Sequence, residues 1–162
     1  MMAWLPQHLP TQTRSALIHG DYRLDNLIFH PTELRVIGML DWELSTLGDP
    51  MSDFAYHCMS WHIPHDLWRG ISGLDTRALG IPDEASYRRW YLQRVTGEAA
   101  IDESTWRFYL GFNLFRMSAI LHGAERAQQG NANADDAVAT GRKAVPLATL
   151  ARQMVEVASI SA

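Results

Sequence analysis

Short apolar runs, each bounded by polar or turn-forming residues, fill the first third of the chain. Runs of this length that contain β-branched residues are typical of β-strands. The predicted strands cover residues 16–18, 27–30 and 35–40. The turn-forming sequence PTEL separates the second from the third, so we expect these two to pair as an antiparallel β-hairpin. The sequence STLGDP at 45–50 predicts a loop.

Helical patterns fill the rest of the chain. The predicted helices cover residues 50–60, 83–97, 102–130 and 135–160, separated by a Gly- and Pro-containing segment at 61–82 and by the sequence NANADD. Asp49 and Pro50 mark the start of the first predicted helix, because Asp caps free backbone N–H groups and Pro fits the first turn. The third helix is apolar on most sides between Trp106 and Leu121, which predicts a buried central helix. Pro146 marks a kink in the last predicted helix or a junction between two helices.

The pattern as a whole predicts a single mostly helical α+β domain over residues 1–162. Its 47% apolar and 20% charged residues are ordinary for a globular protein. The net charge of −4 offers no basic surface for nucleic acid. No apolar run reaches the roughly eighteen residues of a membrane span. The N-terminus lacks the pattern of a signal peptide, and the single cysteine cannot form an internal disulfide, so we expect a cytoplasmic protein.

Three polar residues lie at the ends of the predicted hairpin strands. Asn26 directly precedes the first strand, Asp41 directly follows the second, and Asp21 lies five residues before Asn26. Because the open ends of a hairpin are adjacent, with Cα atoms roughly 5 Å apart, we expect these side chains to face one space. Carboxylate and amide oxygens are the ligands that Mg²⁺ prefers beside phosphate oxygens. The spacing His19-x-Asp21-x-x-x-x-Asn26 also matches the catalytic loop of kinases, with Asp41 in the place of the later metal-binding Asp.

The sequences LIHGDYRLDNLIF (17–29) and VIGMLDWELSTLGDPMSDFAYH (36–57) closely resemble the aminoglycoside phosphotransferase and choline kinase family. Within that family, the resemblance is closest to the branch found beside, or fused to, acyl-CoA dehydrogenases. It is dense over residues 17–62, and the helical pattern is compatible to about residue 150. The resemblance implies the C-terminal lobe of a protein-kinase-like fold, with a small β-hairpin carrying the catalytic loop. It also implies transfer of phosphate from ATP, with Mg²⁺, to a small-molecule hydroxyl acceptor.

The resemblance further implies a role for each polar position. Asp21 resembles the catalytic base, and Asn26 and Asp41 resemble the Mg²⁺ ligands next to the nucleotide. His19 resembles a support of the catalytic loop. Arg23 is expected either to place its cation on the transferred phosphate or to form a surface ion pair.

Other polar and aromatic positions are expected to be structural. Asp49 and Asp53 resemble the family's structural carboxylates behind the active site, and Asp49 is also expected to cap a helix. The spacing of His and Cys in HCMSWHIPH (57–65) fits no metal-binding pattern. The aromatic residues of the third predicted helix are expected in the core, and the pair at 88–89 on a solvated face.

A kinase also needs a second lobe, with a loop over the phosphates and a Lys on its third strand. Only 18 residues precede His19, and they contain no glycine-rich phosphate loop. The only lysine, Lys143, follows the catalytic loop far along the chain. We therefore expect the N-terminal nucleotide-binding lobe to be absent and the chain alone to be inactive. Apolar surface left exposed by that absence predicts self-association or binding of a partner lobe.

Two alternative functions remain open from the sequence. A non-catalytic remnant or interaction module would retain the motif as a scaffold and would show no ATP-dependent metal binding. A metal-dependent phosphohydrolase would use His19, Asp21, Asp53 and His57, and would hold a transition metal tightly.

Overall fold

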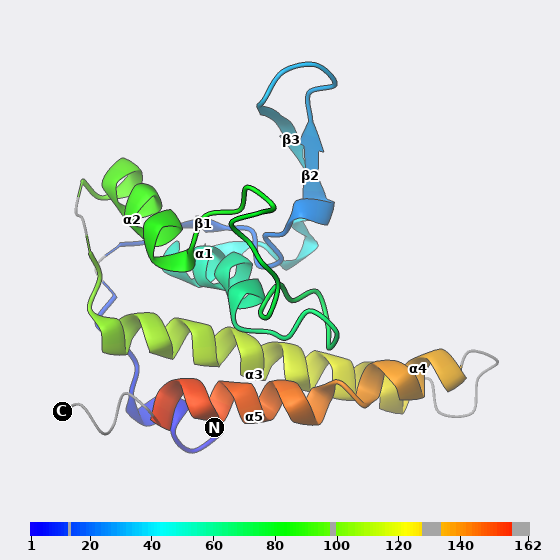
Figure 1. The fold of residues 1–162 in the computed structure, drawn as a ribbon. Coiled ribbons are helices and arrows are strands. Elements are labelled where there is room, and N and C mark those ends of the chain that lie inside the picture. Colours follow the sequence, from blue (N-terminus) through cyan, green and yellow to red (C-terminus); the bar gives the residue numbers. More distant parts are fainter. Residues whose placement is uncertain (13, 98–99, 128–133, 157–162) are drawn as a thin grey trace.

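The computed structural model describes residues 1–12, 14–97, 100–127 and 134–156 (Figure 1). The strands are β1 (Ala16–Ile18), β2 (Leu27–Phe29), β3 (Val36–Met39) and β4 (Thr46–Gly48). The α-helices are α1 (Met51–Cys58), α2 (Glu84–Val95), α3 (Glu103–Ala127), α4 (Ala134–Gly141) and α5 (Ala144–Glu156). Short 3₁₀ turns cover Leu5–Gln7, Leu24–Asn26, Trp42–Leu44 and Met59–Trp61. The result is a mixed α and β fold in which helices predominate.

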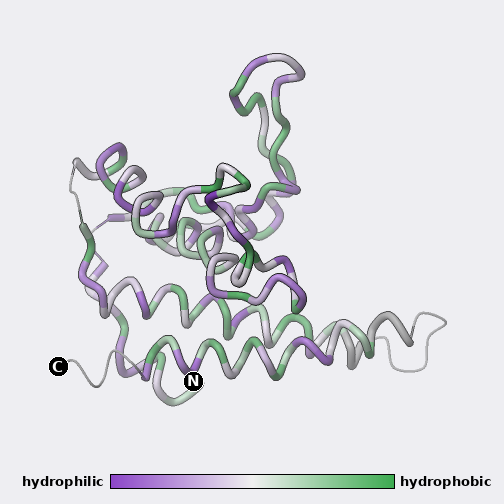
Figure 2. The backbone as a smooth tube through the Cα atoms, viewed as in Figure 1, coloured by the Kyte–Doolittle hydropathy of each residue, from purple (hydrophilic) through white to green (hydrophobic). Residues whose placement is uncertain are grey.

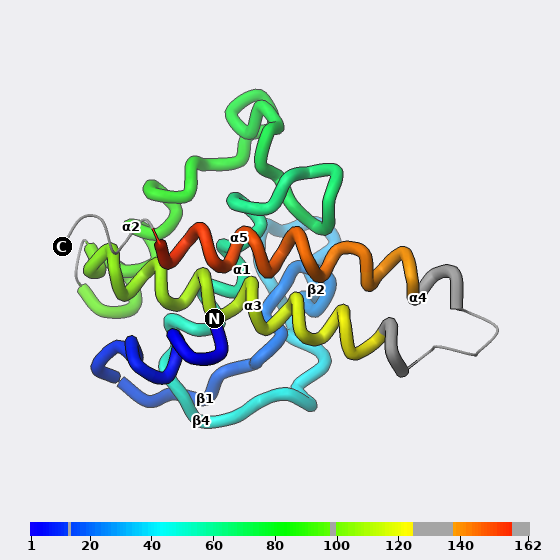
Figure 3. The backbone as a smooth tube through the Cα atoms, turned by 90° about the horizontal axis from the view of Figure 1, so that it is seen from below, coloured from blue at the N-terminus to red at the C-terminus, as the bar shows by residue number. Residues whose placement is uncertain are grey.

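Helices α3 and α5 lie side by side and form the base of the molecule, and α1 packs on the opposite side of α3 (Figures 1 and 3). The buried core is centred on α3, through Trp106, Leu110 and Leu114, which are at most 1% exposed. The predicted central helix is therefore confirmed over its described length, and residues 128–130 lie outside the described part of the chain. Helix α1 therefore packs against a buried helix, α3, and α1 carries residues of the candidate site.

The predicted hairpin is confirmed. Strands β2 and β3 pair antiparallel, with Leu27 opposite Met39 and Ile28 opposite Gly38. The hairpin projects from the body, and Figure 2 shows that much of its length is hydrophobic. Its exposed apolar side chains are Ile28, Phe29, Leu34, Val36, Ile37 and Met39. These side chains make the projecting hairpin an exposed, largely apolar part of the described surface.

The loop predicted at 45–50 is wrong in part, because Thr46–Gly48 forms β4. This strand pairs antiparallel with β1, so that Ile18 lies opposite Thr46 and Ala16 opposite Gly48. Three residues are too few for a strand pattern, and the partner strand lies far earlier in the sequence. Because β1 pairs with β4, the segment between them, residues 19–45, begins and ends at the same place beside α1.

The remaining helices agree with the sequence, with one change near the C-terminus. Asp83 caps α2, since its carboxylate accepts the Ser86 N–H at 2.8 Å, and Gly97 follows α2 with a φ of +77°. The predicted junction near Pro146 lies instead at residues 142–143, and Pro146 belongs to the first turn of α5. Pro is tolerated there, because the first N–H groups of a helix have no partner within it. Residues 157–160 lie outside the described chain.

The solvated face predicted for residues 88–89 is wrong for Arg88. Its guanidinium lies 5.0 Å from the centre of the Trp106 ring and 3.2 Å from the Glu103 carboxylate. A planar guanidinium stacks well on an indole, so Arg88 covers the buried Trp106. Arg89 is exposed, as predicted. Among the described helices, none is long and apolar enough to span a membrane.

Candidate active site

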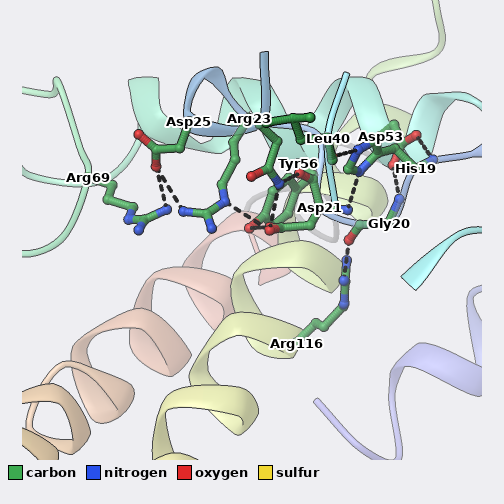
Figure 4. A network of polar contacts seen from close by, with 11 residues as sticks. His19, Gly20, Asp21, Arg23, Asp25, Leu40, Asp53, Tyr56, Arg69 and Arg116 are labelled. Atoms are coloured by element: carbon green, nitrogen blue, oxygen red, sulfur yellow. Dashed lines mark hydrogen bonds and ion pairs between the residues drawn. The ribbon is translucent and has the colours of Figure 1, made fainter. Parts of the chain in front are cut away.

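The loop that follows β1 is held by a carboxylate from α1. Asp53 accepts the backbone N–H of His19 at 2.5 Å through Oδ2 and that of Gly20 at 2.9 Å through Oδ1 (Figure 4). Gly20 has a φ of +82°, and a Cβ there would overlap the Leu44 carbonyl oxygen, so the turn requires glycine. Two charge-assisted bonds from one side chain fix the backbone immediately before Asp21.

The His19 ring joins this loop to the end of the hairpin. Its Nε2 lies 2.7 Å from the Leu40 carbonyl oxygen, and its Nδ1 lies 3.3 Å from the backbone nitrogen of Asp21. Since a carbonyl only accepts and an N–H only donates, these partners assign the proton to Nε2 and leave Nδ1 as the acceptor. The ring also lies 4.7 Å, centre to centre, from the Trp42 ring. His19 is buried and connects the two segments that carry the candidate site residues.

Both oxygens of the Asp21 carboxylate are held by donors. Oδ1 accepts the Tyr56 hydroxyl at 2.5 Å, and Oδ2 accepts Arg23 Nε at 2.8 Å and Asn26 Nδ2 at 3.0 Å. Burial by itself raises the pKa of this carboxyl, but the bonds from Tyr56, Arg23 and Asn26 outweigh it, so the pKa lies below the usual Asp value. Asp21 is therefore an oriented carboxylate at neutral pH.

Asn26 uses its amide nitrogen on Asp21, which determines where its oxygen points. Nδ2 donates to the Asp21 carbonyl at 2.9 Å as well as to the carboxylate, and the described residues provide no donor to Oδ1. The Asn26 side chain therefore keeps a carbonyl oxygen available for a cation.

Asp41 lies beside Asn26 in the hairpin ladder. The Leu40 N–H donates to the Asn26 carbonyl at 2.8 Å, so the residue after Leu40 is Asn26's diagonal neighbour. Asp41 is exposed, and its carboxylate makes no hydrogen bond or ion pair with the described residues. Its backbone has a φ of +66°, a conformation that costs a non-glycine residue free energy and is often found at functional sites. The donor set at this corner is one amide oxygen and one carboxylate, which suits Mg²⁺.

The remaining sequence predictions have mixed outcomes. Arg23 forms an ion pair with Asp21, and its NH1 lies 2.8 Å from the Asp25 carboxylate. Asp49 accepts the Met51 N–H at 2.9 Å and the Tyr109 hydroxyl at 2.8 Å, so it satisfies a free N–H at the start of α1, as predicted, although the N-cap position itself is Pro50. The structure thus brings His19, Asp21 and Asn26 into one network, with Asp41 next to it. That the side-chain oxygens of Asn26 and Asp41 approach within about 6 Å, as one shared Mg²⁺ requires, stays a prediction.

The described residues contain no group of three or more His, Cys, Asp or Glu side chains that could hold a metal ion. Two residues of the phosphohydrolase alternative have other partners in the structure. Asp53 binds backbone N–H groups, and His57 lies among the rings of Tyr22, Trp61 and Tyr87. Burial lowers the pKa of His57, as expected for an imidazole in an aromatic setting.

Two residues of the network were not identified from the sequence. Tyr56 lies one turn after Asp53 on α1, and its burial together with the Asp21 bond raises the pKa of its hydroxyl. Arg116 on α3 donates to the Gly20 carbonyl and lies 5.4 Å from the centre of the Tyr56 ring. The signal for Arg116 was a charged residue within the apolar stretch of the central helix. Such a residue needs a partner, and here the partner is the loop that follows β1.

Comparison with known proteins identifies the family of this chain. A sequence model described as the phosphotransferase enzyme family matches residues 1–91. A solved structure of a candidate aminoglycoside phosphotransferase from Ralstonia eutropha JMP134 is 53% identical, with a TM-score of 0.84. That match covers 96% of this chain and 47% of the solved chain.

Curated relatives carry acyl-CoA dehydrogenase names. Acyl-CoA dehydrogenase family member 10 of Mus musculus is 45% identical over 93% of this chain, and the probable acyl-CoA dehydrogenase IBR3 of Arabidopsis thaliana is 37% identical over 84%. The chain spans only 14% and 17% of their respective lengths. These similarities agree with the branch indicated by the sequence resemblance.

Proposed function

Because the chain belongs to the phosphotransferase enzyme family, we propose that it is the catalytic lobe of an ATP- and Mg²⁺-dependent kinase acting on a small-molecule hydroxyl. The observation that carries the proposal is the Asp21 carboxylate, which is held by three donors, one of them the amide nitrogen of Asn26. An oriented base next to a cation site is the arrangement that phosphoryl transfer requires.

Each residue has a separate task in this proposal. Asp21 accepts the proton of the acceptor hydroxyl or orients it toward the phosphate. Asn26 and Asp41 hold Mg²⁺, which supplies charge neutralisation at the phosphates when it is bound. His19 keeps the Asp21 backbone and the Leu40 end of the hairpin in register. Most of the catalysis is then positioning and electrostatic stabilisation.

Arg23 connects the base to the transferred group in this scheme. In the structure its guanidinium contacts Asp21 and Asp25, and its side chain remains 28% exposed. A guanidinium has five donors, so contacts to a phosphate oxygen are compatible with keeping Asp21. We expect Arg23 to neutralise part of the charge on the transferred phosphate.

We further propose that a second lobe completes the nucleotide site. The family and the 47% coverage of the solved relative support this, since a two-lobed enzyme divides its nucleotide contacts between the lobes. The exposed apolar hairpin, with Leu17 on β1 and Leu47 on β4, offers a surface for that lobe or for a second copy.

The metal part of the proposal predicts that Mg²⁺ stabilises the chain. At a tenfold excess over its dissociation constant, Mg²⁺ should raise the melting temperature by about 3–5 °C, because it binds only the folded site. Asp41→Asn should lose most of this rise. The measurement is thermal melting with and without Mg²⁺, with Asp66→Asn, an exposed carboxylate away from the site, as the matched control. Equal rises in the wild type and Asp41→Asn would show that the ion binds elsewhere.

A further inference from the structure

The three hydrogen bonds to the Asp21 carboxylate leave one of its acceptor sites open. A carboxylate has about four lone-pair sites, two on each oxygen. Oδ2 uses both of its sites on Arg23 and Asn26, whereas Oδ1 uses one site on Tyr56. The described residues provide no second donor to Oδ1, and 18% of the Asp21 side chain is exposed. A hydroxyl that approaches this carboxylate therefore finds the open site on Oδ1, the oxygen that faces Tyr56.

Tyr56 can serve this oxygen only as a hydrogen-bond donor. The residue is buried, and burial together with the Asp21 bond raises the pKa of its hydroxyl. The phenol therefore stays protonated at neutral pH, while the Asp21 carboxyl, whose pKa lies below the usual Asp value, stays ionised. An uncharged donor beside the open site orients the carboxylate without competing for the proton that the carboxylate receives.

Helix α3 fixes both partners of this bond. Arg116 donates to the Gly20 carbonyl, immediately before the candidate base, and its guanidinium lies 5.4 Å from the centre of the Tyr56 ring (Figure 4). One turn earlier on α3, the buried Asn113 donates to the Ser52 carbonyl at 2.9 Å, and Ser52 lies one turn before Tyr56 on α1. Residues three apart share one face of a helix. The loop and the helix that form the Tyr56 contact are thus attached to the same face of α3.

We propose that Tyr56 is a positioning residue of the candidate base: its hydroxyl fixes the rotation of the Asp21 carboxylate so that the open site on Oδ1 receives the acceptor hydroxyl, and Arg116 holds the two partners of that bond together. This inference rests on the proposed kinase function and adds two residues to it. Without Tyr56 the carboxylate keeps donors at Oδ2 alone, so its other oxygen is no longer fixed. Transfer between two bound groups depends on such alignment.

A second pair of Tyr and Asp provides a matched control for this contact. The Tyr109 hydroxyl donates to Asp49 at 2.8 Å, the residue is buried, and burial and that bond raise the pKa of its hydroxyl. Asp49 lies at the start of α1, where it also accepts the Met51 N–H. Removing the Tyr109 hydroxyl therefore deletes a buried bond of the same chemistry without touching the candidate base.

Carbon NMR of the full 162-residue chain measures the effect on the base without ATP, metal or phosphate transfer. The Asp21 carboxyl resonance is assigned by its loss in Asp21→Asn and is followed as the pH is lowered. Because the Tyr56 bond favours the ionised carboxylate, Tyr56→Phe should move the midpoint of this titration to higher pH by about one pH unit, as expected for one hydrogen bond to a charged group. Tyr109→Phe should leave the midpoint unchanged while lowering stability in urea by a similar amount.

The wild-type chain provides a second measurement, which does not depend on the folding of Tyr56→Phe. A phenol bonded to a carboxylate gives a downfield hydroxyl proton resonance. We expect such a resonance from Tyr56, lost in Asp21→Asn and retained in Tyr109→Phe, and we expect it to shift with the same midpoint as the Asp21 carboxyl carbon. Equal midpoints in the wild type and Tyr56→Phe, or a Tyr56 proton that does not respond to Asp21, would overturn the inference.

Kinetics of the two-lobed enzyme distinguish this inference from the proposed function. Tyr56→Phe should lower kcat by about ten- to a hundredfold with KM nearly unchanged, because the alignment of the base is lost and binding is not. Tyr109→Phe should retain wild-type kcat. An unchanged kcat in Tyr56→Phe would overturn the positioning role in an enzyme that is otherwise active. A shifted Asp21 titration in an enzyme that transfers no phosphate would support the Tyr56 contact and contradict the proposed function.

Discussion

In the completed two-lobed enzyme, Asp21→Asn should lower kcat for phosphate transfer by about 10²–10⁴-fold. The amide has nearly the shape of the carboxylate but cannot accept the hydroxyl proton. Its nitrogen cannot accept, so a Tyr56 hydroxyl that faces the nitrogen has to accept a hydrogen bond instead of donating one. The measurement is kcat at saturating ATP, in parallel with urea unfolding to show that the variant is folded.

Asp66→Asn is the matched control for this experiment, because it removes one carboxylate from an exposed position outside the site. It should retain wild-type kcat. A fall of less than about tenfold in Asp21→Asn would be too small for a general base and would assign Asp21 a structural role.

Asp53→Ala should lower the free energy of unfolding by about 3–6 kcal/mol. The change removes the acceptor of two backbone N–H groups, those of His19 and Gly20, and hydrogen bonds to a charged group contribute about 1.5–3 kcal/mol each. Because these N–H groups fix the loop that carries Asp21, the proposed function predicts that transfer by the completed enzyme falls as well. Urea unfolding measures the first effect, and the transfer assay on folded protein measures the second.

Asp66→Ala provides the baseline for that unfolding experiment and should change stability by less than about 0.5 kcal/mol. If Asp53→Ala were no less stable than this control, the loop would be fixed by its other contacts. Those contacts are the His19 ring on Leu40 and the Arg116 side chain on Gly20.

Local chemistry in the sequence was sufficient to predict the parts of the site that lie close together in the chain. The PTEL turn between two apolar runs predicted the β2–β3 hairpin, because a turn sequence between strand-forming runs expresses that pairing directly. The five-residue spacing, which matches the catalytic loop of kinases, predicted that Asp21 and Asn26 lie together, and their side chains are hydrogen-bonded.

Contacts between distant segments could not be predicted in the same way. Strand β4 is three residues long and forms only because β1 offers it a partner, so its own sequence suggests a loop. Tyr56 and Arg116 reach the loop after β1 from α1 and α3, and nothing in their local sequence specifies that contact. Arg88 was assigned to solvent because a charged pair usually is solvated, whereas its stacking on Trp106 depends on the packing of α2 against α3.

The most direct test of the account is the transfer of labelled phosphate from ATP to a panel of hydroxylated metabolites. Three samples are compared: the 162-residue chain, the chain fused to the part of the Ralstonia eutropha relative outside the match, and that fusion with Asp21→Ala. We expect the chain alone to bind Mg-ATP only at about millimolar dissociation constant, equivalent to about 4 kcal/mol, and to transfer no phosphate above background. The fusion should transfer phosphate, and Asp21→Ala should abolish the transfer. Rapid turnover by the 162-residue chain alone would contradict the two-lobe account, and a silent fusion that is folded and binds ATP would favour an inherited, non-catalytic scaffold.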